Sequence, residues 1–117
     1  MANDACEVYF NSSCNKCRDA RAILEARGVA ATYREYLTTP PSRTELEHVM
    51  KLLGIDDPRA MMRTGEALYT DLALATATRD ALLDAMVAHP RLIERPIVIV
   101  GNRAVIARPA SKVEELL

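Results

Sequence analysis

The stretch Asn11-Ser-Ser-Cys-Asn-Lys-Cys-Arg18 decides the fold of this chain. It follows a short apolar run, Val8-Tyr9-Phe10, and leads into an amphipathic segment over residues 20–27. The order strand, short loop, helix places Cys14 at the N-terminus of the helix. Unpaired backbone N–H groups and the helix dipole stabilise a thiolate there. Cys14 is therefore the predicted nucleophile, and Cys17, one helical turn later, is the predicted resolving thiol.

The two cysteines of this loop allow three interpretations. A zinc site needs two more ligands, and the chain offers only Cys6, His48 and His89, none of them in a paired spacing. Buried structural cysteines are the second interpretation, because free cysteine often packs as a small hydrophobic residue. The third is a redox pair, since Cys-x-x-Cys between a strand and a helix is typical of a thioredoxin-like unit. We favour the redox pair, expect no metal site, and expect Cys6 to be packed in its strand.

The composition indicates one globular domain. The 117 residues are 50% hydrophobic and 26% charged, with a net charge of −1, so no general attraction to nucleic acid or to a membrane is predicted. Locally, Lys16 and Arg18 bring positive charge to Cys14. The first residues show no signal peptide, and no apolar run reaches the roughly 20 residues of a membrane span. We expect a cytoplasmic protein whose cysteines serve thiol chemistry.

The remaining patterns predict a mixed sheet of four strands. Strands are expected at residues 6–10, 30–36, 96–100 and 103–107, with the first pair parallel and the last pair joined by a Gly101-Asn102 hairpin turn. Helices are expected after Ser42, which forms a capping box with Glu45, and after Asp57, Thr78 and Ser111. The sequence therefore predicts a single α/β domain over residues 1–117, thioredoxin-like, with a helical insert at about 42–89.

Five segments resemble the ArsC family of arsenate reductases, in the branch that works with glutathione and glutaredoxin. They are residues 9–18 (YFNSSCNKCR), 35–43 (EYLTTPPSR), 59–63 (RAMMR), 89–98 (HPRLIERPIV) and 107–109 (ARP). The resemblance implies that Cys14 is the nucleophile and that three arginines bind the oxyanion. These arginines are Arg63, Arg95 and Arg108.

The resemblance also implies supporting residues and a reaction. Asn11 and Arg18 lie in the cysteine segment, and Pro96 matches a proline that is usually cis in such folds. The implied activity is thiol-dependent reduction of arsenate, with no bound cofactor or metal. Electrons would come from glutathione, and glutaredoxin or thioredoxin would be the protein partner. Arginine suits this role, because its guanidinium binds tetrahedral oxyanions through paired hydrogen bonds.

Two departures from the family pattern keep other functions open. Phe10 stands where many of these reductases have histidine, and Cys17 stands where they usually have serine or threonine. A Cys-x-x-Cys pair also occurs in Spx, a related family of regulators that bind RNA polymerase. The alternatives are thus a redox-sensing regulator of the Spx type and a general disulfide reductase.

Overall fold

The computed structural model describes residues 5–117, which divide into two compact units. The first holds the residues up to Thr39 together with Arg95–Leu117, and the second holds Pro40–Glu94. The expectation that the chain starts without a signal peptide falls almost entirely on residues outside the described part. No helix of residues 5–117 is long and apolar enough to cross a membrane.

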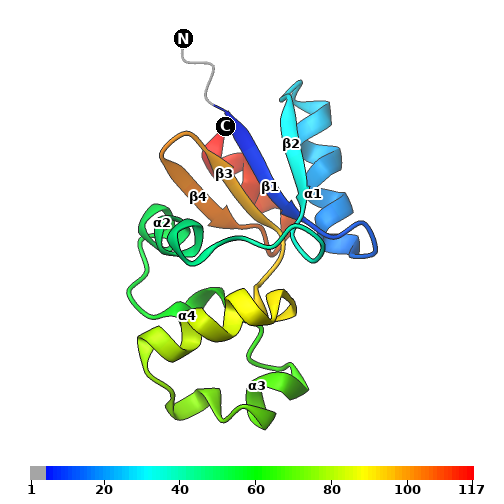
Figure 1. Cartoon of the computed structure of the whole chain (residues 1–117). Helices are drawn as coiled ribbons and strands as arrows, with labels where there is room; N and C mark the ends of the chain where they lie inside the picture. The colour runs from blue at the N-terminus through cyan, green and yellow to red at the C-terminus, as the bar shows by residue number, and fades with distance from the viewer. Residues whose placement is uncertain (1–4) are drawn as a thin grey trace. The chain divides into compact units, whose positions relative to one another are not determined.

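The first unit is built on a four-stranded sheet with the order β2-β1-β3-β4 (Figure 1). The strands are β1 (Cys6–Phe10), β2 (Ala31–Glu35), β3 (Ile97–Val100) and β4 (Arg103–Ile106). β1 pairs in parallel with β2 and antiparallel with β3, and β3 pairs antiparallel with β4. The predicted mixed sheet is confirmed. The parallel pair requires a helical crossover, and α1 (Asn15–Ala26) supplies it.

Two helices cover one face of this sheet, α1 and the 3₁₀ helix η4 (Ala110–Leu116), and both lie behind the sheet in Figure 1. Leu24 of α1 and Val113 of η4 are fully buried in the same core as Val8 and Val98. The prediction that Ser111 caps the last helix is wrong. The helix starts at Ala110, two residues before the predicted start, and Pro109 occupies the cap position.

A glycine, Gly28, follows the end of α1. Gly28 has φ +71°, a conformation that is strained for residues with a Cβ. Its N–H donates to the Glu25 carbonyl, and the Val29 N–H donates to the Leu24 carbonyl. This pair of bonds is the Schellman arrangement, which directs the chain from α1 into β2.

The second unit is helical, as the predicted insert requires. Its elements are α2 (Arg43–Leu53), η1 (Pro58–Met61), α3 (Ala67–Asp71), η2 (Leu74–Thr76), α4 (Arg79–Ala88) and η3 (Pro90–Leu92). The caps predicted at Asp57 and Thr78 are confirmed. The helix after Asp57 ends at Met61, because Met62 forms a β-bridge with Ile93. On α4, Val87 is exposed.

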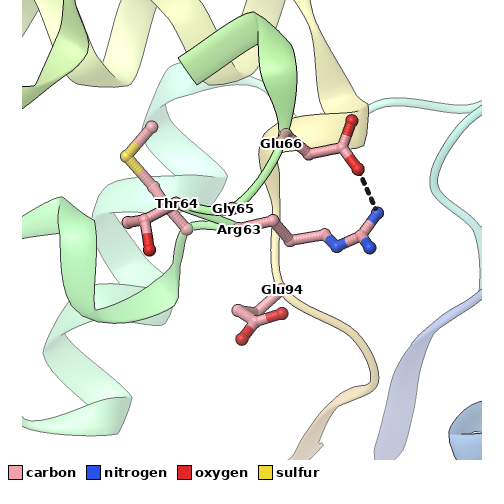
Figure 2. A pocket seen from close by; sticks show the side chains of 6 residues that line it. Arg63, Thr64, Gly65, Glu66 and Glu94 are labelled. Atoms are coloured by element: carbon pink, nitrogen blue, oxygen red, sulfur yellow. Dashed lines mark ion pairs between the residues drawn. The ribbon is translucent and has the colours of Figure 1, made fainter. Parts of the chain in front are cut away.

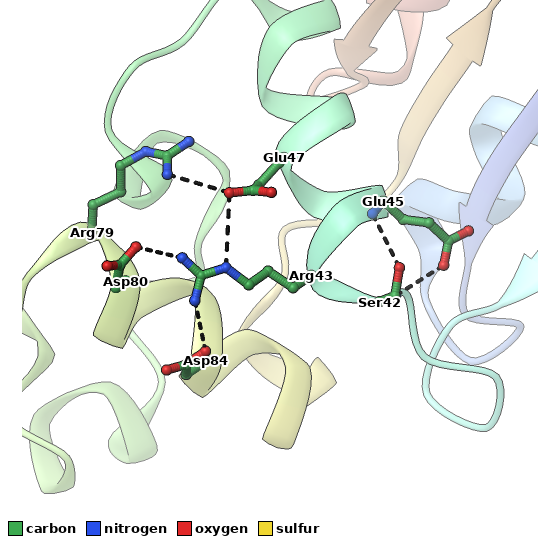
Figure 3. Close-up of polar contacts among 7 residues, drawn as sticks. All are labelled: Ser42, Arg43, Glu45, Glu47, Arg79, Asp80 and Asp84. Carbon is green, nitrogen blue, oxygen red and sulfur yellow. Dashed lines mark hydrogen bonds and ion pairs between the residues drawn. The ribbon is translucent and has the colours of Figure 1, made fainter.

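Polar contacts join the helices of this unit (Figure 3). Arg43 on α2 contacts Asp80 and Asp84 on α4, the latter at 3.0 Å between Nη1 and Oδ1. In the same unit, Nη2 of Arg59 donates to the carbonyls of Leu74 and Ala77, each at 2.8 Å. Arg59 thereby satisfies backbone acceptors of a segment that has little regular structure of its own.

The capping box of α2 gives a stability prediction. The Glu45 N–H donates to Ser42 Oγ at 3.1 Å, and the Ser42 N–H donates to Glu45 Oε1 at 2.9 Å (Figure 3). We expect Ser42→Ala to lower the free energy of unfolding by about 1 kcal/mol, since the Glu45 N–H loses its acceptor. Thermal unfolding followed by circular dichroism measures this. Thr44→Ala, in the same turn, is the matched control, and equal losses in both variants would contradict the assignment.

Candidate active site

The loop between β1 and α1 holds Cys14 at the helix N-cap. Its backbone is extended, with φ −97° and ψ 123°, and its N–H donates to the Asn11 carbonyl at 2.9 Å. The Asn11 side chain accepts from the Ser13 N–H at 2.9 Å. Asn11 therefore shapes the loop through both its backbone and its side chain. Cys14 itself is 9% exposed.

The surroundings of Cys14 favour its thiolate. Burial alone would raise the pKa of Cys14, but the backbone N–H of Cys17, the Arg95 side chain and the Cys17 thiol together lower it below its ordinary value. The N–H of Cys17 lies in the first turn of α1, so the N-terminus of this helix contributes to the lowered pKa of Cys14. The result is the electropositive setting of a reactive cysteine.

The surroundings of Cys17 disfavour its thiolate, unlike those of Cys14. It is fully buried in the core of the first unit. Burial, together with the neighbouring Cys14, raises the pKa of Cys17 to about 12. Its S–H donates to the Cys14 sulfur, so the two sulfurs are in contact while all three cysteines of the described chain are free thiols. Cys17 is thus a protonated neighbour of Cys14 at neutral pH. Cys6 is buried in β1, as expected, and burial raises its pKa.

Arg95 is the cation that acts on Cys14. Burial works against its charge, but hydrogen bonding and attraction to the Cys14 sulfur, together with Tyr36, hold the pKa of Arg95 above its ordinary value. The Arg95 carbonyl accepts from Nη1 of Arg108 at 2.9 Å. Arg95 and Arg108 are therefore linked, and the structure brings Cys14, Arg95 and Arg108 into one connected group within the first unit.

Two supporting residues have different surroundings. Pro96 is buried directly after Arg95, and the peptide bond between them is cis, as the resemblance implies. Arg18 is exposed on α1 and hydrogen-bonds Oδ1 of Asn15. The positive charge that lowers the pKa of Cys14 comes from Arg95, which lies far from it in the sequence.

The sequence analysis missed Tyr36. This tyrosine is fully buried, stacks on Tyr9 with ring centroids 6.4 Å apart, and acts on the Arg95 guanidinium. In the sequence it is an aromatic residue at the end of a predicted strand, which is also the pattern of an ordinary core residue. Residues 35–43 resemble a known family, but nothing in this segment marks the tyrosine as a neighbour of an arginine.

Arg63 belongs to the second unit. It lines a cavity of about 290 Å³, formed by Met62, Arg63, Thr64, Gly65, Glu66 and Glu94. Its guanidinium points toward Glu66, with 3.0 Å between Nη1 and Oε2 (Figure 2). Contacts connect Cys14 with Arg95 and Arg95 with Arg108, whereas only the sequence pattern groups Arg63 with them. Residues 5–117 contain no group of three or more His, Cys, Asp or Glu that could hold a metal ion.

Comparisons with known proteins identify the family. The model of the ArsC family matches residues 9–116, which is nearly the whole chain. The chain belongs to the ArsC family. A protein of Neisseria meningitidis serogroup A named arsenate reductase is 41% identical over 113 residues, covering 95% of this chain and 97% of the relative. One of Haemophilus influenzae with the same name is 43% identical over 112 residues, covering 94% and 97%.

A solved structure supports the ArsC fold. The arsenate reductase from Vibrio cholerae superimposes with a TM-score of 0.94 at 42% identity, covering 97% of this chain and 98% of that one. The thioredoxin-like α/β fold of the ArsC family, predicted from the order of strands and helices, is thereby confirmed.

Proposed function

We propose that this ArsC protein reduces arsenate to arsenite in the cytoplasm, with Cys14 as the nucleophile. The observation that carries the proposal is the contact between the Cys14 sulfur and the Arg95 guanidinium at the start of α1, in a chain that resembles arsenate reductases over almost its full length. The contact joins the thiolate to a group suited to tetrahedral oxyanions.

The first step forms an S–As bond. The Cys14 thiolate attacks the As(V) centre, and one arsenate oxygen leaves as water after taking up protons from solvent. Arg95 and Arg108, with Arg63 by the family pattern, would hold the remaining oxygens and stabilise the negative charge that develops on them. Arsenic is still As(V) in this adduct, so no electrons have yet moved.

The second step transfers two electrons. A second thiol attacks the Cys14 sulfur, the S–As bond breaks with its electron pair passing to arsenic, and arsenite leaves as As(III). The two sulfurs are oxidised to a disulfide. Glutathione is the proposed second thiol, with glutaredoxin or thioredoxin restoring Cys14. Cys17 is the alternative, because its sulfur already contacts that of Cys14.

The test is arsenite production from arsenate with glutathione, glutaredoxin and NADPH, for the native protein and for Cys17→Ser. We expect turnover in both, with Cys17→Ser within about threefold of native, because the serine hydroxyl can still donate to the Cys14 sulfur. Turnover in the native protein alone would make Cys17 the resolving thiol. If neither protein turns over while Cys14 still reacts with iodoacetamide, the proposed substrate is wrong.

A regulatory function is the second candidate, and the contact between the two cysteine sulfurs favours it. Oxidation of this pair would give a disulfide between the loop after β1 and the first turn of α1, as in a redox switch. Capture of RNA polymerase by the oxidised protein, compared with a Cys17→Ser variant that cannot form the pair, tests it. Equal capture by both would argue against a switch.

A further inference from the structure

We propose that Glu66 is the positioning residue for Arg63. The Glu66 carboxylate holds the Arg63 guanidinium in one orientation until an oxyanion takes the place of the carboxylate. The inference rests on the proposed function, because it gives Arg63 its oxyanion. It concerns a residue of the second unit that neither the sequence pattern nor the likeness to known proteins assigned.

Glu66 has both carboxylate oxygens committed to arginines. Oε2 lies 3.0 Å from Nη1 of Arg63, and Oε1 lies 3.2 Å from Nε of Arg91 (Figure 2 shows the first pair). The Glu66 side chain is 18% exposed and that of Arg63 is 29% exposed. Water therefore screens this pair less than it screens an ordinary surface ion pair.

Glu66 is the N-cap residue of α3, but its carboxylate does not cap this helix. A short polar side chain at an N-cap, such as Asp or Ser, usually accepts from backbone N–H groups of the first turn. Glu66 makes no such side-chain bond. Its carboxylate points back to Arg63, three residues earlier, across a turn closed by the Glu66 N–H and the Arg63 carbonyl at 3.1 Å. The carboxylate thus pairs with Arg63, and the Glu66 side chain accepts no hydrogen bond from the N-terminus of α3.

The backbone of Arg63 is held by contacts that do not involve the Glu66 side chain. Its N–H donates to the Leu92 carbonyl at 2.7 Å, and the preceding Met62 pairs with Ile93. What remains free at this position is the long side chain, whose many rotamers make ordering costly. Glu66 removes that freedom, so the guanidinium is already oriented along the wall of the cavity. Preorganised donors bind and stabilise anions better than mobile ones.

The exchange of partners follows from charge. An arsenate dianion offers the guanidinium two oxygens, whereas Glu66 offers Arg63 one, the other being held by Arg91. Arg63 can therefore move from carboxylate to oxyanion, while Glu66 keeps Arg91 and is not left as an unpaired charge. Removing Glu66 should accordingly weaken substrate binding more than it slows the chemical steps.

Two readouts test the proposal on the full chain, with Glu66→Ala and Glu66→Gln compared with native. We expect Glu66→Ala to raise the KM for arsenate about tenfold with kcat within about threefold. Glu66→Gln should fall between the two, because the amide still offers Arg63 one acceptor. Independently of activity, the Nε–H signal of Arg63 in nitrogen-15 NMR spectra, assigned by its loss in Arg63→Lys, should change from that of an ordered arginine to that of a mobile one in Glu66→Ala.

Glu47→Ala is the matched control, because Glu47 also contacts two arginines of the same unit, Arg43 and Arg79. It should leave both the KM and the Arg63 signal unchanged. An ordered Arg63 in Glu66→Ala, or an unchanged KM despite a mobile Arg63, would overturn the proposal. If the native protein reduces no arsenate, the proposed function fails, and the NMR comparison alone decides whether Glu66 positions Arg63.

Discussion

Cys14→Ser should lower kcat/KM for arsenate reduction by at least about 10³-fold, the largest effect expected of any substitution in this protein. Cys14 is the one cysteine whose pKa the protein lowers, whereas burial raises the pKa of Cys6 and of Cys17. A serine hydroxyl stays protonated at neutral pH even with the Cys17 N–H and Arg95 beside it. The variant therefore has no thiolate to form the S–As bond.

Cys6→Ala is the control for this variant, because it removes a thiol that is buried in β1 and has no part in the proposed reaction. It should keep native turnover per folded molecule. Circular dichroism melting of both variants separates loss of chemistry from loss of fold. Arsenite production by folded Cys14→Ser at a rate near native would show that the nucleophile lies elsewhere.

Arg95→Ala should have the second-largest effect, lowering kcat/KM by about 10² to 10³. The guanidinium hydrogen-bonds to the Cys14 sulfur, and its charge lowers the pKa of Cys14. Without it, burial of the thiol is opposed only by the Cys17 contacts, so the pKa of Cys14 rises. Less thiolate is then present at neutral pH, and an oxyanion ligand is lost as well.

The pH dependence of iodoacetamide reaction at Cys14 isolates the first of these two effects. In the native protein, the midpoint should lie below that of a free cysteine, because the folded protein favours the thiolate. In Arg95→Ala it should move to higher pH. Arg95→Lys should shift less, since it keeps the charge, but should still lose kcat/KM because lysine lacks the planar fork that binds two oxygens at once.

Arg27→Ala is the control for general loss of positive charge, because Arg27 lies in the same unit but pairs with Glu114 at the far end of α1. It should change neither the midpoint nor the rate. A midpoint that stays unchanged in Arg95→Ala would mean that the backbone N–H and the thiol of Cys17 lower the pKa of Cys14 without help from Arg95.

Local features of the fold were predictable because they depend on neighbours in the sequence. Ser42 and Glu45 cap α2, and Gly54 ends it with φ +73°, as their spacing indicates. The predictions were wrong where residues distant in the sequence determine the local structure. Ser111 has the chemistry of a cap, yet η4 begins at Ala110. Met62 would extend a helix by its own propensity, but pairing with Ile93 makes it extended.

The order of the strands and helices and the place of Cys14 at the start of α1 can be predicted from the sequence alone. Both follow from hydrophobic periodicity and turn chemistry within short stretches. Which cation lowers the pKa of Cys14 depends on the tertiary structure. Lys16 and Arg18 are nearest in sequence, but Arg18 turns to Asn15, and Arg95 acts on the sulfur instead. The physical reason is that pairing of β1 with β3 carries Arg95, which directly precedes Pro96 and β3, to the loop after β1. Interactions between side chains depend on distance in space, and strand pairing sets that distance across 81 residues of sequence.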